Sequence, residues 1–331
     1  MGKYIQESEL INSSFDCFCI NLATAGSLSD IGHISLKKLL KYFFLLKHIS
    51  NVVREIRPEL VYITPNAGRK AFFKDFIVVQ MLKSMGCKVI AHYHNKGVSV
   101  YQSKWVYNFF YKRFFSNLKV ILLAENLYKD MAKYVKREDV YICPNGIPSS
   151  CKEEMEARRN NVIPHLLFLS NLLISKGVIV LLDALRILKE KGYLFNCQYV
   201  GGETAEINAM QFVVEVERRK LNDRVAYAGR KVGEEKNTFF QQADIFILPT
   251  MNECFPLVIL EAMEYKLPVI STNEGGIPDD CIAKLLDDEE LRVKMGNAGY
   301  EKFCREFTLQ RFESRMLDIL SQNLPQKEKE N

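Results

Sequence analysis

Short apolar segments alternate along the chain with longer segments in which apolar residues recur at helical spacing. The short segments are rich in valine, isoleucine, leucine and phenylalanine, which is typical of strands in a buried sheet. Strands that alternate with helices favour parallel sheets covered by helices. The pattern predicts ten strands, at Phe15–Leu22, Leu60–Thr64, Lys88–His92, Lys119–Ala124, Val140–Cys143, Leu166–Ser170, Phe195–Gly201, Arg224–Tyr227, Asp244–Leu248 and Pro268–Ser271. Helical spacing dominates the segment Asp287–Leu320, which precedes a polar tail.

The pattern breaks between the fifth and sixth predicted strands. The sequence Pro144-Asn-Gly-Ile-Pro148 is followed there by the charged stretch Lys152–Asn161. Proline and glycine interrupt regular structure and the charges do not enter a core, so the break predicts a domain boundary. We expect Rossmann-like domains at 1–147 and 164–305, a linker at 148–163, and a C-terminal helix with a polar tail at 306–331. Two doubly wound domains facing each other across a cleft would bind ligands at the carboxyl ends of their strands.

Length and composition fit two such domains and exclude other classes of protein. The 331 residues, 48% hydrophobic and 26% charged, suffice for two cores and argue against collagen-like or long disordered chains. No apolar run approaches the roughly 20 residues of a transmembrane helix, and the first residues do not resemble a secretory signal. The nine cysteines show no zinc-site spacing, and we expect Cys17 and Cys19 to be buried strand residues. These features predict a cytoplasmic protein with reduced thiols.

Charge is distributed unevenly between the two halves of the chain. Residues 1–150 hold 21 Lys and Arg against 11 Asp and Glu, whereas the remaining residues hold 24 against 29. A basic half is able to meet nucleic acid, an anionic membrane surface or a phosphorylated substrate, and charge alone does not choose among them.

Two acidic residues flank the start of the helix predicted after the strand Asp244–Leu248. Glu253 lies in the loop, Pro256 stands where the helix begins, and Glu261 lies about a turn and a half inside it. A helix start offers free amide donors and a positive dipole end. The two carboxylates are suited to accept hydrogen bonds from sugar or ribose hydroxyls, and the amides of Phe255–Leu257 are suited to donate to them. An isolated pair of this kind is more often a solvated helix start.

Joined to the later stretch Asn273–Asp279, this segment resembles the retaining glycosyltransferases of family 4, which have the GT-B fold of two Rossmann-like domains. Their E-x7-E motif corresponds here to Glu253 and Glu261. The resemblance implies that Glu253 and the helix start Phe255–Leu257 bind the donor sugar and that Glu261 binds the ribose. It also implies a nucleotide-diphosphate sugar as the donor substrate.

The resemblance extends to the loop that follows the strand Leu166–Ser170. Lys176-Gly177 matches the family's phosphate-contacting Lys-Gly, and an ammonium there would offset the charge that builds on the leaving diphosphate. The family often places an arginine in this loop as a second phosphate ligand, and this chain has Asn171 at that position.

The stretch Ala226–Lys231 corresponds to the part of the family that lies against the nucleotide base. Gly229 would permit close approach of the base, and Arg230 or Lys231 would add a phosphate contact.

A histidine of the first domain matches the family's acceptor-side residue. His94 follows the strand Lys88–His92, and a neutral imidazole is able to hydrogen-bond a sugar hydroxyl or the leaving phosphate. His92 alternates with His94 on the same face of an extended segment, so spacing does not separate the two. A histidine that serves only its loop is the alternative.

The sequence predicts no metal site and no cofactor. It contains no Asp-x-Asp triplet, so we do not expect a divalent ion held by paired aspartates to activate the diphosphate. The resemblance likewise implies a metal-independent reaction.

Two basic and aromatic segments of the first domain, Leu36–Ile49 and Trp105–Phe115, combine apolar residues with lysines and arginines. Rings and cations together suit a lipid headgroup interface, so an anionic membrane surface is a candidate partner and the inner face of the membrane a candidate location. Apolar stripes that face the core are the alternative. No RNA-binding motif accompanies these segments, and we expect no nucleic-acid partner.

The chain departs from the family in two places. It does not show the family's first strand with its Gly-rich loop, and about 20 residues are absent after Asp279. The expected fold is therefore an α/β GT-B fold without the first strand and with a shortened C-terminal domain. The expected function is retaining sugar transfer to a glycan or lipid-linked acceptor in cell-surface polysaccharide synthesis. A degenerate homologue that binds nucleotide or partner enzymes without turnover, and a sugar-nucleotide epimerase, are the alternatives.

Overall fold

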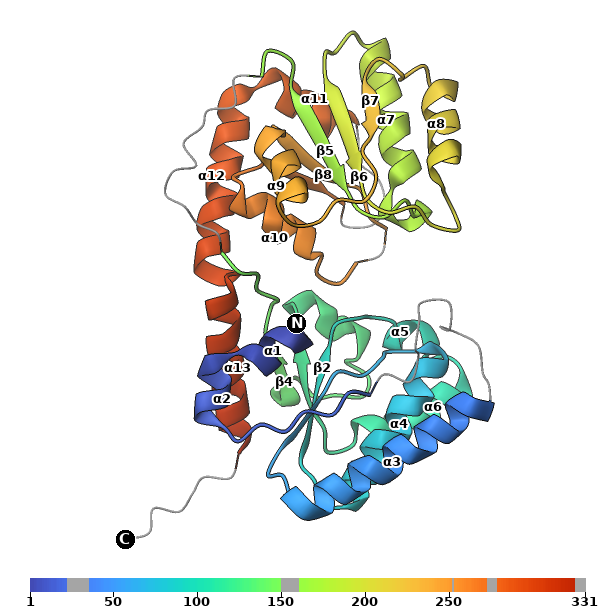
Figure 1. Ribbon diagram of the computed structural model, residues 1–331, viewed down its shortest axis with the longest axis vertical. Helices are drawn as coiled ribbons and strands as arrows, with labels where there is room; N and C mark the ends of the chain where they lie inside the picture. The colour runs from blue at the N-terminus through green and yellow to red at the C-terminus, as the bar shows by residue number, and fades with distance from the viewer. Residues whose placement is uncertain (23–35, 150–160, 252, 273–278, 325–331) are drawn as a thin grey trace. The chain divides into compact units, whose positions relative to one another are not determined.

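The computed structural model describes residues 1–22, 36–149, 161–251, 253–272 and 279–324. Most of the charged stretch 152–161 and of the motif 273–279 therefore lies outside the described residues. By its contacts the chain divides into unit 1, Met1–Asn145 with Phe312–Asn331, and unit 2, Gly146–Arg311 (Figure 1). The last helix packs within unit 1, although it follows unit 2 in the sequence, where the sequence analysis set 306–331 apart.

Unit 1 contains a four-stranded parallel sheet in the order β1-β2-β3-β4. The strands are β1 (Val61–Ile63), β2 (Val89–Tyr93), β3 (Lys119–Leu122) and β4 (Val140–Ile142). The helices are α1 (Gly2–Glu7), α2 (Glu9–Ser14), α3 (Leu36–Ile56), α4 (Arg69–Ser84), α5 (Val98–Tyr101), α6 (Trp105–Phe115) and α13 (Leu309–Asn323), with short 3-10 helices at Glu125–Asp130 and Arg137–Asp139. Four of the five strands predicted for this half are confirmed, within two residues at each end.

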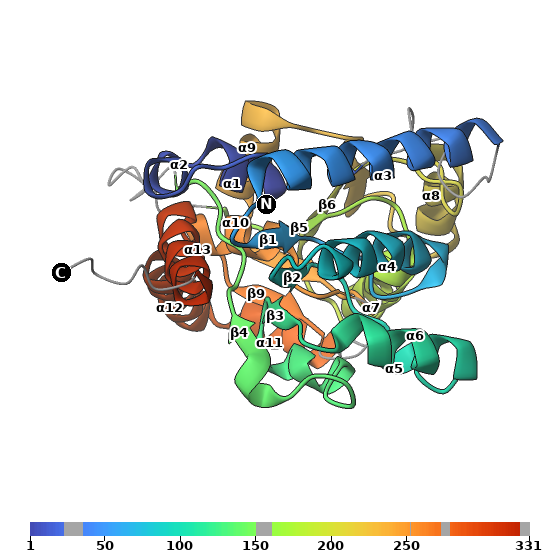
Figure 2. The same ribbon diagram turned by 90° about the horizontal axis from the view of Figure 1, so that it is seen from below.

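Helix α4 lies between α3 and α6 in the layer that covers one face of this sheet (Figures 1 and 2). The layer is joined to the sheet by a core of aromatic rings. Phe72 of α4 packs against Tyr111 and Phe114 of α6 with ring centroids 4.6 and 5.4 Å apart, and all three side chains are fully buried. Rings at these separations add to the stabilisation that comes from their burial.

The strand predicted at Phe15–Leu22 is wrong. Residues 15–22 form no strand, Cys17 and Cys19 are exposed rather than buried, and Phe18 is 60% exposed. Ile20 and Leu22 alone among these residues pack against the core of unit 1. β-Branched and aromatic residues form a strand only where a neighbouring strand supplies hydrogen bonds and packing, and this segment has no such neighbour among the described residues.

Unit 2 contains a five-stranded parallel sheet in the order β7-β6-β5-β8-β9. The strands are β5 (His165–Leu169), β6 (Asn196–Val200), β7 (Val225–Tyr227), β8 (Ile245–Leu248) and β9 (Val269–Ser271). The helices are α7 (Val178–Glu190), α8 (Ala209–Arg218), α9 (Gly233–Gln242), α10 (Leu257–Glu264), α11 (Asp279–Asp287) and α12 (Glu289–Glu306), with a 3-10 turn at Ile174–Lys176. All five strands predicted for this half are confirmed.

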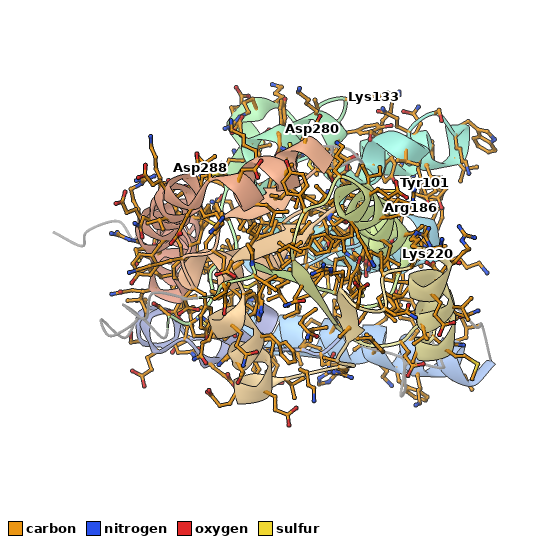
Figure 3. The ribbon with its side chains drawn as sticks, turned by 90° about the horizontal axis from the view of Figure 1, so that it is seen from above. Tyr101, Lys133, Arg186, Lys220, Asp280 and Asp288 are labelled. Carbon is orange, nitrogen blue, oxygen red and sulfur yellow. The ribbon has the colours of Figure 1, made fainter. Side chains whose placement is uncertain are left out.

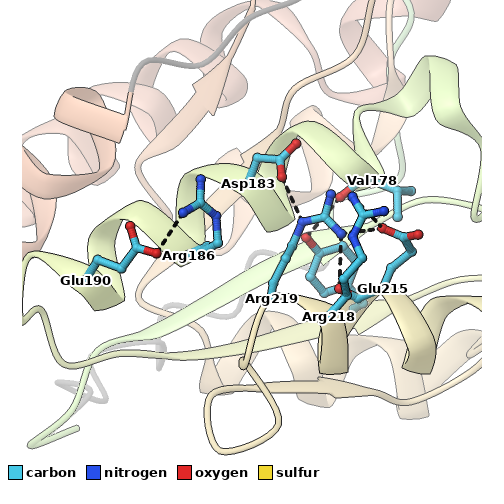
Figure 4. A network of polar contacts seen from close by, with 8 residues as sticks. Val178, Asp183, Arg186, Glu190, Glu215, Arg218 and Arg219 are labelled. Atoms are coloured by element: carbon cyan, nitrogen blue, oxygen red, sulfur yellow. Dashed lines mark hydrogen bonds and ion pairs between the residues drawn. The ribbon is translucent and has the colours of Figure 1, made fainter.

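A buried arginine joins two helices on one side of this sheet (Figure 4). Arg219, whose side chain is 4% exposed, donates to Asp183 of α7 at 2.8 Å and also pairs with Glu215 of α8. Tyr199 of β6 donates to the Val178 carbonyl at the start of α7. A buried charge is tolerated when its hydrogen bonds are satisfied, so this network holds α7 and α8 in place.

Helix α12 of unit 2 begins at a capping aspartate. Asp288, at the start of α12 in Figure 3, accepts a hydrogen bond from the Leu291 amide at 2.8 Å and caps the helix. Of the helices within the described ranges, none combines the length and apolar character needed to cross a membrane.

Candidate active site

Lys176 and Glu253 are in contact at the carboxyl ends of two neighbouring strands of unit 2. Lys176 ends the 3-10 turn after β5, Glu253 lies in the loop after β8, and the ammonium donates directly to the carboxylate. Their side chains are 21% and 28% exposed. An ion pair at this edge of a parallel sheet is accessible to a ligand, as expected for such folds.

Backbone contacts between the two loops fix this pair. Met251 N donates to the Ser175 carbonyl at 2.9 Å, and the Thr250 hydroxyl donates to the same oxygen at 3.3 Å. Gly177 adopts a left-handed φ of +80° and lies directly against the Pro249 carbonyl, where a Cβ atom would clash. Only glycine meets both demands, which explains the Lys-Gly sequence.

Glu261 forms a second ion pair, whose partner the sequence analysis missed. Its carboxylate accepts from the Lys236 ammonium of α9 at 2.9 Å, and both side chains are about one quarter exposed. Lys236 carries no motif, so only the packing of α9 beside α10 shows it. The two glutamates thus belong to separate ion pairs, and each sits beside a lysine from another element.

The start of α10 directs its side chains into the core. Pro256 is the N-cap residue, and Phe255 and Leu257 pack in the cluster around Leu260. The ring of Phe255 contacts Phe307 with centroids 5.6 Å apart. With these side chains turned inward, the groups that residues 255–257 offer a ligand are backbone amides.

The loops after β5 and β7 bring three further predicted residues to the same sheet edge. Asn171 accepts a hydrogen bond from the Gly202 amide at 3.1 Å through Oδ1. Arg230 is exposed, and its side chain passes beside Gly202. Gly229 has a φ of +72°, but a Cβ atom there would meet nothing within 4 Å. Within this unit, therefore, backbone conformation rather than close packing requires glycine at position 229.

In unit 1, His92 and His94 lie on either side of Tyr93 at the carboxyl end of β2, and their ring centroids are 4.2 Å apart. His92 is fully buried, and its Nδ1 lies 2.8 Å from the Tyr62 hydroxyl. His94 is partly exposed. The structure thus separates the two histidines, since only His94 reaches the surface.

Both imidazoles are held in the neutral form. Burial, and then the positive charge of the chain's N-terminus, lower the pKa of His94 to about 4, and burial lowers the pKa of His92 well below its usual range. Nε2 of each ring and Oδ1 of Asn145 are buried without a hydrogen-bond partner in the described part of the chain. This end of the sheet is therefore a neutral polar cluster with unused hydrogen-bonding atoms.

The loop after His94 is held by hydrogen bonds to two neighbouring segments. Asn95 accepts from the Ala67 amide at 2.6 Å, and Asp130 accepts from the amides of Gly97, Val98 and Ser99 at 2.8 to 3.0 Å. A carboxylate that binds three successive amides fixes the backbone firmly. Within the described ranges, no three His, Cys, Asp or Glu side chains gather where they could hold a metal ion.

Comparison with known sequences points to one family. Residues 163–296 match the family model described as glycosyl transferases group 1. The chain is 26% identical over 234 residues to the amylovoran biosynthesis glycosyltransferase AmsK of Erwinia amylovora, with 64% of this chain and 56% of the relative covered. It is 24% identical over 238 residues to the putative teichuronic acid biosynthesis glycosyltransferase TuaC of Bacillus subtilis, with 68% and 55% covered. The chain thus spans a little over half the length of these two relatives.

Solved structures share the fold at low sequence identity. The sucrose-phosphate synthase of Thermosynechococcus elongatus superimposes with a TM-score of 0.67 at 18% identity, covering 88% of this chain and 80% of that one. Anabaena Alr3699/HepE, solved in complex with UDP, gives a TM-score of 0.67 at 16% identity and covers 84% and 82%. We conclude that unit 2 is similar in sequence to the glycosyl transferases group 1 and that the two parallel-sheet units have a GT-B fold.

Proposed function

We propose that this protein is a retaining glycosyltransferase that moves a sugar from a nucleotide-diphosphate sugar to a glycan or lipid-linked acceptor, without a metal ion or cofactor. The observation that carries the proposal is the contact between Lys176 and Glu253 at the carboxyl ends of β5 and β8. A cation and a hydroxyl-binding carboxylate side by side fit the junction of a sugar and its phosphate. Relatives named for amylovoran and teichuronic acid biosynthesis support a polysaccharide acceptor, and the UDP complex of a structural neighbour supports a nucleotide donor.

In this proposal the anomeric C–O bond to the diphosphate breaks and an acceptor hydroxyl forms the new bond on the same face of the sugar. The hydroxyl proton passes to the leaving diphosphate, so no covalent enzyme intermediate is required. Lys176 offsets the negative charge that grows on the diphosphate, and a positioned cation of this kind typically contributes about 100-fold or more to the rate.

The remaining contacts orient the donor. Glu253 and the backbone amides of Phe255 and Leu257, on either side of Pro256, bind the sugar hydroxyls, Glu261 binds the ribose, and the loop at Gly229 lies against the base. Lys236 holds the Glu261 carboxylate in place, which makes Lys236 a positioning residue in our proposal. His94 contacts the acceptor hydroxyl or the leaving phosphate, since it is the histidine of the pair that reaches the surface.

A panel of nucleotide sugars tests the proposal in two steps. We expect one donor to raise the melting temperature of the full chain, because a ligand that binds only the folded state stabilises it. With a polysaccharide-pathway acceptor and EDTA present, that donor should give a glycoside with the donor's anomeric configuration. Binding without transfer would indicate a non-catalytic homologue, and conversion of the donor without acceptor would indicate an epimerase. Either result would contradict the proposal.

We also propose that unit 1 meets an anionic membrane surface through the first half of α3. Leu39, Leu40, Phe43 and Phe44 are 54 to 64% exposed and occupy two turns of the outer face of this helix. Farther along, the same face carries Asn51, Arg54 and Glu55. The apolar patch is thus confined to one end of the helix, in the half of the chain that has the basic excess. Apolar side chains among cations favour anionic lipid interfaces.

Flotation with vesicles containing phosphatidylglycerol tests this second proposal. We expect salt-sensitive association that falls by at least about fivefold in the Phe43→Ser, Phe44→Ser double variant. An Asn51→Ser, Glu55→Gln variant on the polar half of the same helix is the matched control and should float as the unmodified chain does. Equal flotation of all three proteins would contradict the proposal, as would concentration-dependent self-association through the same residues.

A further inference from the structure

The cationic side chains at the sheet edge of unit 2 differ in whether their charge is compensated, because most of them form ion pairs with carboxylates. Lys176 pairs with Glu253, Lys236 with Glu261 at 2.9 Å, and Lys231 with Glu235 at 3.3 Å. A diphosphate carries at least two negative charges, so Lys176, which also pairs with Glu253, does not balance them alone. In the described residues, Arg230 has no ion pair and no hydrogen bond, so it is the cation at this edge whose charge is uncompensated.

The nearby acids make an uncompensated cation more necessary. Glu203 accepts from the Ala209 amide and Glu206 from the Ile174 amide, both at 2.9 Å, so two further negative charges lie in the loop after β6. A nucleotide diphosphate that approaches this edge is repelled by both. Arg230 follows the adjacent strand β7 and is placed to offset them.

Gly202 brings Arg230 and Asn171 together. A Cβ atom on Gly202 would lie 3.1 Å from Asn171 Oδ1 and 3.9 Å from Arg230 Cδ, so both side chains pass over the same glycine. Asn171 Oδ1 is occupied by the Gly202 amide, which leaves its Nδ2 group as a donor near the Arg230 side chain. A guanidinium and an amide donor are both suited to bind the oxygens of a phosphate group.

Building on the proposed function, we infer that Arg230 is the second cation that binds the donor's diphosphate, and that Asn171 acts beside it as a neutral donor over Gly202. The positive charge is supplied from the loop after β7 instead of from position 171. Lys231, already paired with Glu235, has no part in it.

Titration calorimetry of the full chain with UDP, GDP and ADP, and with the matching nucleosides, tests the inference. For the diphosphate that binds, we expect Arg230→Ala to weaken affinity about tenfold or more while leaving nucleoside affinity unchanged, because only the phosphate contact is lost. Arg230→Gln, which keeps the length of the side chain, should lose as much. Lys231→Ala is the matched control and should stay within about twofold.

A relocation variant gives the sharper result. Adding Asn171→Arg to Arg230→Ala places a guanidinium on the other side of Gly202, and we expect it to restore most of the lost diphosphate affinity. Unchanged binding in Arg230→Ala, or a larger loss in Lys231→Ala, would overturn the inference while the proposed function stands. A chain that binds none of the three diphosphates would overturn both.

Discussion

The two units carry polar residues at the carboxyl ends of their parallel sheets, but the chemistry of those residues differs. In unit 2 the edge is formed by ion pairs, of which Lys176–Glu253 is 21% and 28% exposed. In unit 1 the corresponding end holds neutral imidazoles, and His92 is fully buried. Charged and accessible groups suit a diphosphate, whereas neutral groups with unused lone pairs suit a hydroxyl.

The difference also predicts which substitutions affect function alone and which affect stability as well. Ion pairs with this exposure contribute about 0–1 kcal/mol to folding, so their residues are replaceable without unfolding the chain. Burying a histidine in its neutral form, by contrast, couples that residue to the stability of its unit. We therefore expect variants of the ion pairs in unit 2 to alter catalysis with little effect on stability, and variants of the histidine cluster in unit 1 to alter both.

The largest effect is expected for the ion pair. Lys176→Ala and Glu253→Gln should each lower the rate of sugar transfer about 100-fold or more, because the leaving diphosphate loses its counter-charge or the donor sugar loses a ligand. Initial rates at saturating donor measure this. The melting temperature should change by no more than a few degrees, since the pair is partly exposed. Full activity in the Lys176 variant would remove that residue from the site.

Gly177→Ala should break the same site through the backbone. The added Cβ would clash with the Pro249 carbonyl, and a non-glycine residue at φ +80° adds strain. We expect a loss of about 2 kcal/mol in the free energy of unfolding, together with weaker nucleotide binding, since the loop carrying Lys176 must move. Denaturant titration and calorimetry measure the two quantities. Gly192→Ala is the control, because it shares a left-handed φ of +87° but has open space around it.

Some residues of the site were predictable from the sequence and others were not. Lys176-Gly177 and the Glu253 to Glu261 spacing were predictable because they match short motifs of the family that the sequence resembles. Lys236 was not, since its pairing with Glu261 depends on how α9 packs beside α10. The same limit affected the fold: nine strands were predictable from apolar runs, whereas Phe15–Leu22 has a strand's composition without a neighbouring strand.

The histidine pair of unit 1 shows a further limit of prediction from sequence. Spacing placed His92 and His94 on one face, but their different burial depends on Tyr62, which lies on another strand. Asp130 and Asn95, which hold the loop after His94, come from positions with no motif. Tertiary contacts of this kind leave no periodic signal in the chain.

The stability of unit 1 should depend on pH through the histidine pair. Both pKa values are lower in the folded chain than the ordinary 6.5, with His94 at about 4, so the unfolded chain binds protons first as the pH falls. Above pH 6.5 the histidines therefore do not lower the free energy of unfolding. As the pH falls from 6.5 towards 4, the free energy of unfolding decreases progressively. We expect this loss to be about 2–3 kcal/mol for His94, measured by denaturant unfolding across that range.

The His94→Asn variant is the control for that measurement. It removes the titrating ring while retaining a polar side chain, so its stability should fall less between pH 6.5 and 4 than that of the unmodified chain. An identical pH dependence in the two proteins would show that His94 is not buried in the neutral form, and the contrast between the two sheet edges would then fail.

The smallest effect is expected for Tyr62→Phe, which tests whether His92 supports His94 or only fills the core. Removing the hydroxyl leaves His92 Nδ1 buried without its partner at 2.8 Å, so we expect a loss of about 1 kcal/mol in the free energy of unfolding. Tyr42→Phe is the matched control, because it removes a hydroxyl that donates to the Lys74 carbonyl at 2.6 Å, in the same unit. Both variants should lose similar stability, but only Tyr62→Phe should shift the pH dependence of unfolding, since of these two tyrosines only Tyr62 contacts the imidazole pair. Equal pH profiles in the two variants would make Tyr62 an ordinary core hydrogen bond and leave His94 to be positioned by its own loop, through Asn95 and Asp130.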